Sequence, residues 1–177
     1  ESASGLVDAA GAWGVLDCIC RKQKALIGEA CGHPLDVCMV LSDTPHAFDG
    51  DETIRTLTCG QAHATLRRAA EAGLVHTVSN SQGGLSYICN CCTCSCGILR
   101  GLAEMGIANV VARSAFVNRV EAALCDGCET CLSYCQFTAL QMGPDGTVLV
   151  DAVRCTGCGV CVPACPNAAL VLLRRPP

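Results

Sequence analysis

The chain has 177 residues, of which 18 are cysteines, and a formal net charge of -4. Cysteine at about a tenth of all residues exceeds what packing requires, so it indicates either a disulfide framework or bound metal. The negative charge argues against nucleic acid as a partner. The apolar runs are each interrupted by Gly, Asp or Cys, and none is long enough to predict a transmembrane helix.

The start of the sequence predicts a cytoplasmic protein. It lacks a basic segment followed by an apolar run and a small-residue cleavage site, which a secretory signal requires. Cytoplasmic thiols stay reduced, so clustered cysteines there bind metal more often than they form disulfides. The basic residues are scattered in twos and threes, which predicts solvated faces; they include Arg21, Lys22, Lys24, Arg67, Arg68, Arg174 and Arg175.

Residues 1–114 alternate helix and strand patterns and predict a small, mixed α/β, cysteine-rich domain. Thr58 can cap a helix with an apolar stripe, and Gly73 can end it. In chain order we expect a helix over 5–12, strands over 15–17 and 37–41, the capped helix over 61–72, a strand over 74–78, a helix over 97–105 that ends at Gly106, and a strand over 107–111.

An internal repeat follows. The segment CDGCETCLSYCQFTAL, from Cys125 to Leu140, returns 30 residues later as CTGCGVCVPACPNAAL, from Cys155 to Leu170. Short strands are expected before each copy, over 117–122 and 147–150, with a helical turn in each copy. The two copies predict one module over 115–177, and the whole chain is therefore expected to be α+β.

Each copy carries the spacing C-x2-C-x2-C-x3-C, the ligand pattern of bacterial ferredoxins with two 4Fe-4S clusters, in which the fourth cysteine binds the other cluster. Gly127 and Gly157 are expected where the loop passes close to a cluster. Pro166 follows the last cysteine as the pattern requires, whereas Gln136 replaces the first proline. The predicted ligands are Cys125, Cys128, Cys131 and Cys165 for one cluster, and Cys155, Cys158, Cys161 and Cys135 for the other.

Nine further cysteines lie in two segments before the repeat. Thiolates this closely spaced repel one another unless a metal neutralises them, so we expect one or two further iron-sulfur clusters. A mixed division, in which the first segment supplies two or three ligands and the second completes the site, is compatible with the spacing. The simplest division gives Cys18, Cys20, Cys31 and Cys38 to a third cluster and four of Cys89, Cys91, Cys92, Cys94 and Cys96 to a fourth.

The histidines and the last cysteine show no clear ligand spacing. His33 is a possible ligand, but its place before Pro34 favours a structural role or one that orients a ligand. Cys59, at a helix start, is expected to be a small buried residue. His46, His63 and His76 are expected at the surface or in packing roles.

The segments CICRKQKALIGEACGHPLDVCMVL and SNSQGGLSYICNCCTCSCGILRGL, with the closing cysteine repeat, resemble a family of bacterial and archaeal 4Fe-4S dicluster-domain proteins. The resemblance implies an intracellular iron-sulfur protein of anaerobic or redox metabolism with a terminal ferredoxin domain. Asn90, Thr93 and Ser95 stand where the family often has cysteine, which leaves the ligand set of this run open.

These features favour an electron-transfer protein or subunit that relays single electrons to or from a larger oxidoreductase without catalysing a reaction itself. Its expected partners are redox proteins that offer a basic surface to an acidic carrier. One alternative is an unusual catalytic cluster on the run from Cys89 to Cys96, since Cys91 and Cys92 resemble the paired cysteines of heterodisulfide reductases. Another is a redox sensor in which cluster loss changes the fold.

Overall fold

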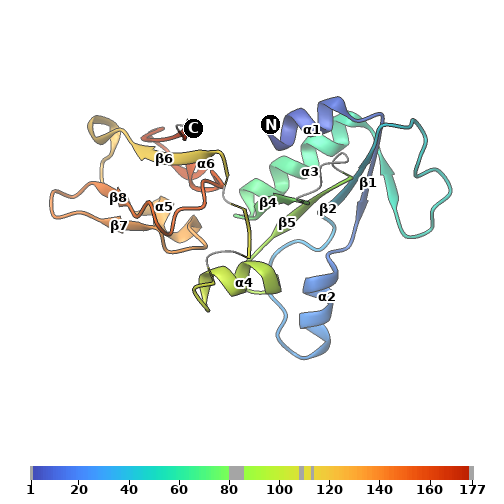
Figure 1. Ribbon diagram of the computed structural model, residues 1–177, viewed down its shortest axis with the longest axis horizontal. Helices are drawn as coiled ribbons and strands as arrows, with labels where there is room; N and C mark the ends of the chain where they lie inside the picture. The colour runs from blue at the N-terminus through green and yellow to red at the C-terminus, as the bar shows by residue number, and fades with distance from the viewer. Residues whose placement is uncertain (1, 80–85, 108–109, 113, 176–177) are drawn as a thin grey trace. The chain divides into compact units, whose positions relative to one another are not determined.

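The structure, a computed structural model, describes residues 2–79, 86–107, 110–112 and 114–175 (Figure 1). The chain forms two compact units, Glu1–Gly97 and Ile98–Pro177. Helices and strands occur in both units, which confirms the predicted α+β class. The domain boundary expected between residues 114 and 115 stays a prediction.

Unit 1 is built on a five-stranded antiparallel sheet with the strand order β3-β1-β2-β5-β4. Antiparallel pairing lets segments far apart in the sequence end at the same edge of the sheet. The strands are β1 (Ala12–Leu16), β2 (Cys38–Ser42), β3 (Arg55–Leu57), β4 (Val75–Val78) and β5 (Tyr87–Cys91).

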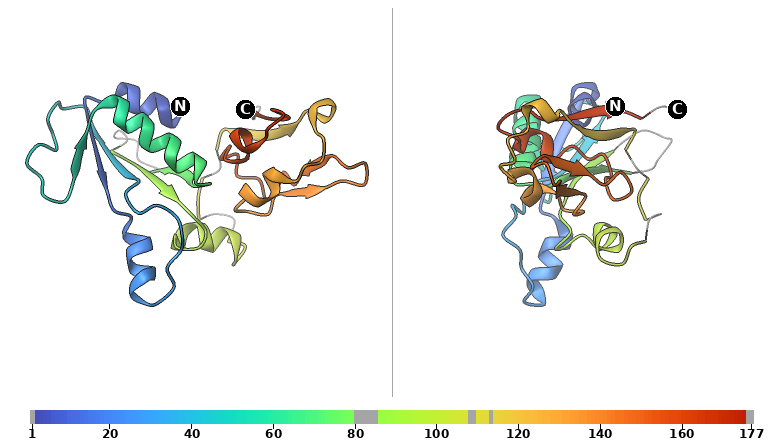
Figure 2. Two further views of the ribbon diagram at one scale, coloured as in Figure 1. Left: turned by 180° about the vertical axis from the view of Figure 1, so that it is seen from behind. Right: turned by 90° about the vertical axis from the view of Figure 1, so that its left-hand side faces the viewer.

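Two helices, α1 (Ala3–Ala9) and α3 (Cys59–Glu71), lie side by side along this sheet (Figures 1 and 2). Their apolar faces pack on the strands in a core that includes Val7, Val15, Met39, Leu41, Leu57, Leu66 and Ile88. The predicted cap of α3 is confirmed, because Thr58 and Gln61 form a reciprocal capping box. A third helix, α2 (Ile19–Leu26), follows directly on β1 and was not predicted.

The register of this sheet decides which cysteines meet. Leu16 pairs with Cys38 across β1 and β2, and Met39 pairs with Ile88 across β2 and β5. One further step in the second register places Cys38 opposite Cys89. The segment after β1, the start of β2 and the end of β5 therefore all bring cysteines to one end of the sheet.

Unit 2 reproduces the sequence repeat as two interlocked halves. The strand before the first copy, β6 (Phe116–Val120), pairs with the strand after the second copy, β9 (Leu170–Arg174). Likewise β7 (Leu140–Met142), after the first copy, pairs with β8 (Val148–Val150), before the second. The short helices are α4 (Gly97–Ala103), which starts at the last residue of unit 1, α5 (Thr130–Tyr134), α6 (Cys161–Ala164) and the single 3-10 turn η1 (Ala122–Leu124).

The backbone repeats as closely as the sequence does. Gly127 and Gly157 both have a φ of 73°, and the pair Thr138 and Ala168 have φ angles of 49° and 52°. The strand over 107–111 was predicted wrongly: Ile107, Val110 and Val111 lie outside any strand, and 108–109 are not among the described residues.

Candidate metal centres

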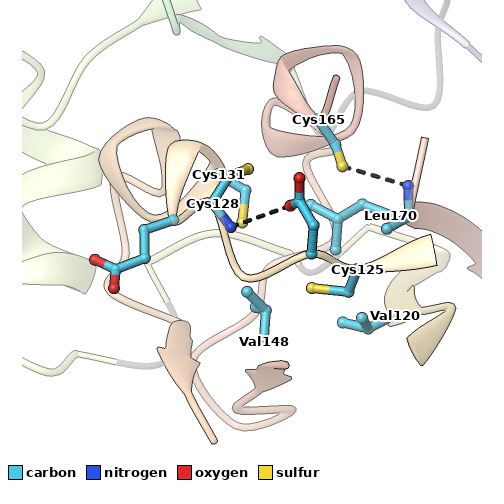
Figure 3. A pocket seen from close by; sticks show the side chains of 10 residues that line it. Val120, Cys125, Cys128, Cys131, Val148, Cys165 and Leu170 are labelled. Atoms are coloured by element: carbon cyan, nitrogen blue, oxygen red, sulfur yellow. Dashed lines mark hydrogen bonds between the residues drawn. The ribbon is translucent and has the colours of Figure 1, made fainter. Parts of the chain in front are cut away.

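The first pocket of unit 2 gathers the four cysteines that the spacing predicts for one cluster. Cys125, Cys128 and Cys131 come from the first copy and Cys165 from the second, and together they line one pocket (Figure 3). Val120, Val148 and Leu170 enclose the same space with apolar surface (Figure 3). Two acidic residues, Asp126 and Glu129, also line it.

The second pocket has the reciprocal composition. Cys155, Cys158 and Cys161 come from the second copy and Cys135 from the first, around one pocket. Both pockets thus contain four thiols that converge from two segments, with apolar walls that limit water. The chemistry of this donor set fits a thiolate-held iron-sulfur cluster.

Hydrogen bonds to sulfur are duplicated by the repeat. The backbone amide of Ala139 donates to Cys135 Sγ and that of Ala169 to Cys165 Sγ, each at 3.3 Å. One further bond has no counterpart in the first pocket. Asn118 Nδ2 donates to Cys161 Sγ at 3.0 Å, whereas Val148 occupies the equivalent position of the other copy.

Burial raises the pKa of three of the thiols that line these pockets. Desolvation, followed by the neighbouring thiols, raises the pKa of Cys161 to about 12. The pKa values of Cys131 and Cys158 are also raised, again mainly by desolvation. Because a metal binds the thiolate form, loading of either pocket must release protons.

Contacts with the protein backbone explain why glycine stands at positions 127 and 157 of the repeat. A Cβ on Gly127 would lie 2.6 Å from the carbonyl oxygen of Gly146, and one on Gly157 would lie 2.0 Å from that of Phe116. Both glycines have positive φ as well. Pro166 is exposed, so its predicted role beside the cofactor rests on the sequence pattern.

Six of the nine cysteines in the two segments before the repeat interact with one another in unit 1. The thiol of Cys18 interacts with that of Cys38, Cys38 with Cys89, Cys89 with Cys91, and Cys91 with Cys96. Cys20 interacts electrostatically with both Cys96 and Cys18. We call this set the ring: Cys18, Cys20, Cys38, Cys89, Cys91 and Cys96.

The thiols of the ring shift one another's pKa values. Interactions with Cys38 and Cys91 lower the pKa of Cys89. The same contact with Cys89, together with Cys96 and burial, raises the pKa of Cys91. Further deprotonation would place thiolates in contact, which requires a neutralising metal.

Arg21 is the charged residue that sequence reasoning misplaced. It was expected on a solvated face, but its side chain is only 2 % exposed. It donates to the carbonyl oxygen of Pro34 at 2.9 Å and to that of Asn90. Burial alone would lower the pKa of Arg21, but Cys18, Cys92 and Cys38 raise it. Among the described residues it forms no ion pair with a carboxylate, and the neighbouring groups that favour its charged form are thiols.

The other three cysteines meet His33 in a separate group. Cys31, His33, Cys92 and Cys94 place one ligand atom each within 4.8 Å of the others. We call these residues the quartet. The structure therefore brings cysteines of the two segments together, with Cys31 beside Cys92 and Cys94, whereas the division of ligands between clusters stays a prediction.

Asn90 fixes the strand between the two groups. Its side chain is fully buried, and its amide nitrogen donates to the carbonyl oxygen of Val37. Its amide oxygen then accepts from His76 Nδ1. Burial lowers the pKa of His76, which favours the neutral ring that this bond uses. The family position often occupied by cysteine is thus a structural amide in this chain.

A separate group of three possible ligands lies between helices α1 and α3. His63 Nε2 lies 2.7 Å from Asp8 Oδ1, and Cys59 on the preceding turn is within 4.8 Å of both ligand atoms. Both Cys59 and His63 are half-buried. Sequence spacing gave no signal for this group, because Asp8 comes from another helix.

The fold and pockets of unit 2 define an iron-sulfur electron-transfer domain. Residues 124–169 match the family of the 4Fe-4S dicluster domain, which confirms the resemblance for this part of the chain. A search of curated proteins found no match to the chain. In the part of the chain that the structure describes, every helix is too short or too polar to cross a bilayer.

Proposed function

We propose that the protein is a single-electron carrier, or the electron-transfer subunit of an oxidoreductase, that relays electrons through two 4Fe-4S clusters in unit 2 and a third in unit 1. The observation that carries the proposal is the pair of four-cysteine pockets, each completed by the other copy of the repeat. When bound, such clusters accept and release one electron at a time. All four thiols of each pocket are occupied in holding the cluster, so no iron is left open to a substrate.

The protein residues tune and shield these sites. Amides of Ala139 and Ala169 donate to ligand sulfurs and stabilise added negative charge. Apolar residues such as Val120 and Leu170 limit the access of water. These contacts are the means by which a protein sets the reduction potential of a cluster.

Electron exchange with a partner is proposed at the first pocket. Cys128 is an exposed ligand, whereas its equivalent Cys158 is half-buried. Asp126 and Glu129 beside it carry negative charge into the rim. A redox partner with a basic docking surface fits this rim, because complementary charge speeds the encounter of the two proteins.

The third cluster is proposed for four of the six ring cysteines. The ring supplies more thiols than one cluster needs, and Arg21 contributes a buried positive charge beside them. Cys91 and Cys92, the pair on which the catalytic alternative rests, lie in different groups, Cys91 in the ring and Cys92 in the quartet. Cys18, Cys91 and Cys96 are buried, which also closes much of the ring to a substrate.

The test is iron and acid-labile sulfide per chain on anaerobically purified protein, with EPR of the dithionite-reduced sample. We expect about twelve iron atoms and twelve sulfides, from three clusters of four irons each. About eight would exclude the third cluster and leave the ferredoxin module alone. Reversible uptake of one electron per cluster in a redox titration supports the relay; substrate turnover by the reduced protein would contradict it.

A further inference from the structure

The quartet of Cys31, His33, Cys92 and Cys94 has the dimensions of a site for a single metal ion. Cys31 Sγ lies 3.9 Å from Cys92 Sγ, and Cys94 Sγ lies 3.6 Å from His33 Nδ1. A tetrahedral zinc ion with Zn–S near 2.3 Å and Zn–N near 2.0 Å separates two sulfurs by about 3.8 Å and a sulfur and a nitrogen by about 3.5 Å. The observed ligand separations agree with both values.

The ligand atoms of a 4Fe-4S cluster are spaced differently from those of a single metal ion. A cubane places four irons and four sulfides between its ligands, so the ligand sulfurs must stand farther apart than around one ion. Among the described residues, neither four-cysteine pocket of unit 2 brings three ligand atoms within 4.8 Å of one another, and the ring does not either. The quartet does so with all four ligands.

The surroundings of the quartet suit a closed tetrahedral site. Cys92 is 1 % exposed and packs against Val37, Ala69 and Leu74, which fixes one ligand in the core. Ser95 Oγ lies 3.4 Å from Cys31 Sγ, where its hydroxyl can donate to a thiolate. Cys94 is exposed and leaves a path for an ion to enter.

A positive charge also lies beside the quartet. Three thiolates and one Zn²⁺ leave a net charge of -1 on the site. Arg21, whose guanidinium interacts with Cys92 and donates to Pro34 in the loop that carries Cys31 and His33, places a positive charge beside this site as well as beside the ring.

We propose that Cys31, His33, Cys92 and Cys94 bind one mononuclear Zn²⁺ ion in a Cys3His site, separate from the iron-sulfur clusters. All four coordination positions are filled by protein, so the site is structural. It ties the loop between α2 and β2 to the segment after β5, beside the ring. The inference does not depend on the relay proposal, because it requires neither a third cluster nor electron transfer.

The first experiment measures zinc and iron separately on the whole chain, expressed with both metals and purified anaerobically. We expect one zinc per chain in addition to the iron. Cys94→Ser and His33→Ala should lose most of the zinc and retain the iron. His33→Cys should keep the zinc, since four cysteines also form a tetrahedral site.

Zinc-edge X-ray absorption then identifies the ligands without interference from iron. The wild type should show three sulfurs near 2.3 Å and one nitrogen near 2.0 Å, and His33→Cys should show four sulfurs. Ser95→Ala, which removes only the outer hydrogen bond, should weaken zinc affinity at least about tenfold.

Cys59→Ser is the matched control, because Cys59 belongs to the other candidate group with Asp8 and His63. The control should retain zinc. Loss of zinc in Cys59→Ser would overturn the assignment, as would a Cys31–Cys92 disulfide in the purified protein. Absence of zinc combined with iron loss in Cys94→Ser would assign the quartet to a cluster instead.

Discussion

The two units assemble their sulfurs in different ways. In unit 2 three ligands of each pocket come from one short loop, and the fourth comes from an identical position in the other copy. In unit 1 neighbours in sequence separate: Cys91 joins the ring and Cys92 the quartet, while Cys38 meets Cys89 across two strands. Local spacing therefore defines a metal site only where the ligand loop is itself local; elsewhere strand register decides.

The strongest test of the local side of this comparison is Cys165→Ala. Because Cys165 completes the pocket of the first copy, its loss should remove about four iron atoms and the same EPR signal that Cys128→Ala removes. Cys135→Ala should remove the other signal. If Cys165→Ala instead abolished the signal lost in Cys158→Ala, the exchange of ligands between copies would be contradicted.

Arg21→Leu tests unit 1, where strand register rather than local spacing brings the cysteines together. The variant leaves the buried sulfurs without their positive charge, and removing one partner of a buried charge pair typically costs about 3–5 kcal/mol. We expect the free energy of unfolding of unit 1 to fall by that order and its metal to be lost, while the EPR signals of unit 2 persist. Denaturant unfolding and metal analysis measure both effects.

The control is Lys22→Leu, on the same helix but solvent-exposed in a surface pair with Asp17. Exposed pairs contribute about 0–1 kcal/mol, so metal content should not change. An equal loss in both variants would show that Arg21 acts through helix α2 rather than through its charge.

Asn118→Val sharpens the comparison within unit 2. The side-chain amide of Asn118 donates a hydrogen bond to a ligand sulfur of the second pocket. In the first pocket, Val148 occupies the equivalent position and has no amide to donate. Such a bond favours the more negative, reduced cluster, so its loss should lower the potential of one cluster. A difference of about 1 kcal/mol corresponds to about 40 mV for one electron.

The reverse change, Val148→Asn, should raise the potential of the other cluster if the new amide reaches its sulfur. Potentials are read by EPR-monitored redox titration. A fall of both potentials in Asn118→Val would contradict a local hydrogen-bond effect.

The smallest effect on the metal sites is expected for Thr58→Ala. This change removes the capping box at the start of α3, a helix that packs in the apolar core of unit 1. Stability should decrease by about 1 kcal/mol without loss of metal. Thr58→Ser, which keeps the hydroxyl, should restore most of the stability; metal loss in Thr58→Ala would mean that α3 positions the sites directly.

The sequence was sufficient for features that depend on local chemistry. The cap at Thr58, the glycines after helices and the cysteine repeat each act over a few residues, and the structure contains all of them. Strand β5 was missed because cysteine and asparagine hide its alternating pattern. The burial of Arg21 was missed because its partner carbonyls at Pro34 and Asn90 lie far along the chain.

The exchange of the fourth cysteine has a consequence for how damage spreads. A duplicated site ordinarily provides a spare, but here each copy holds a ligand that the other cannot replace. Oxidation of Cys135 or Cys165 leaves one pocket with three ligands, and a chain that stops before the second copy leaves both pockets incomplete. The duplication that the repeat records thus produced two centres, neither of which one copy can complete alone.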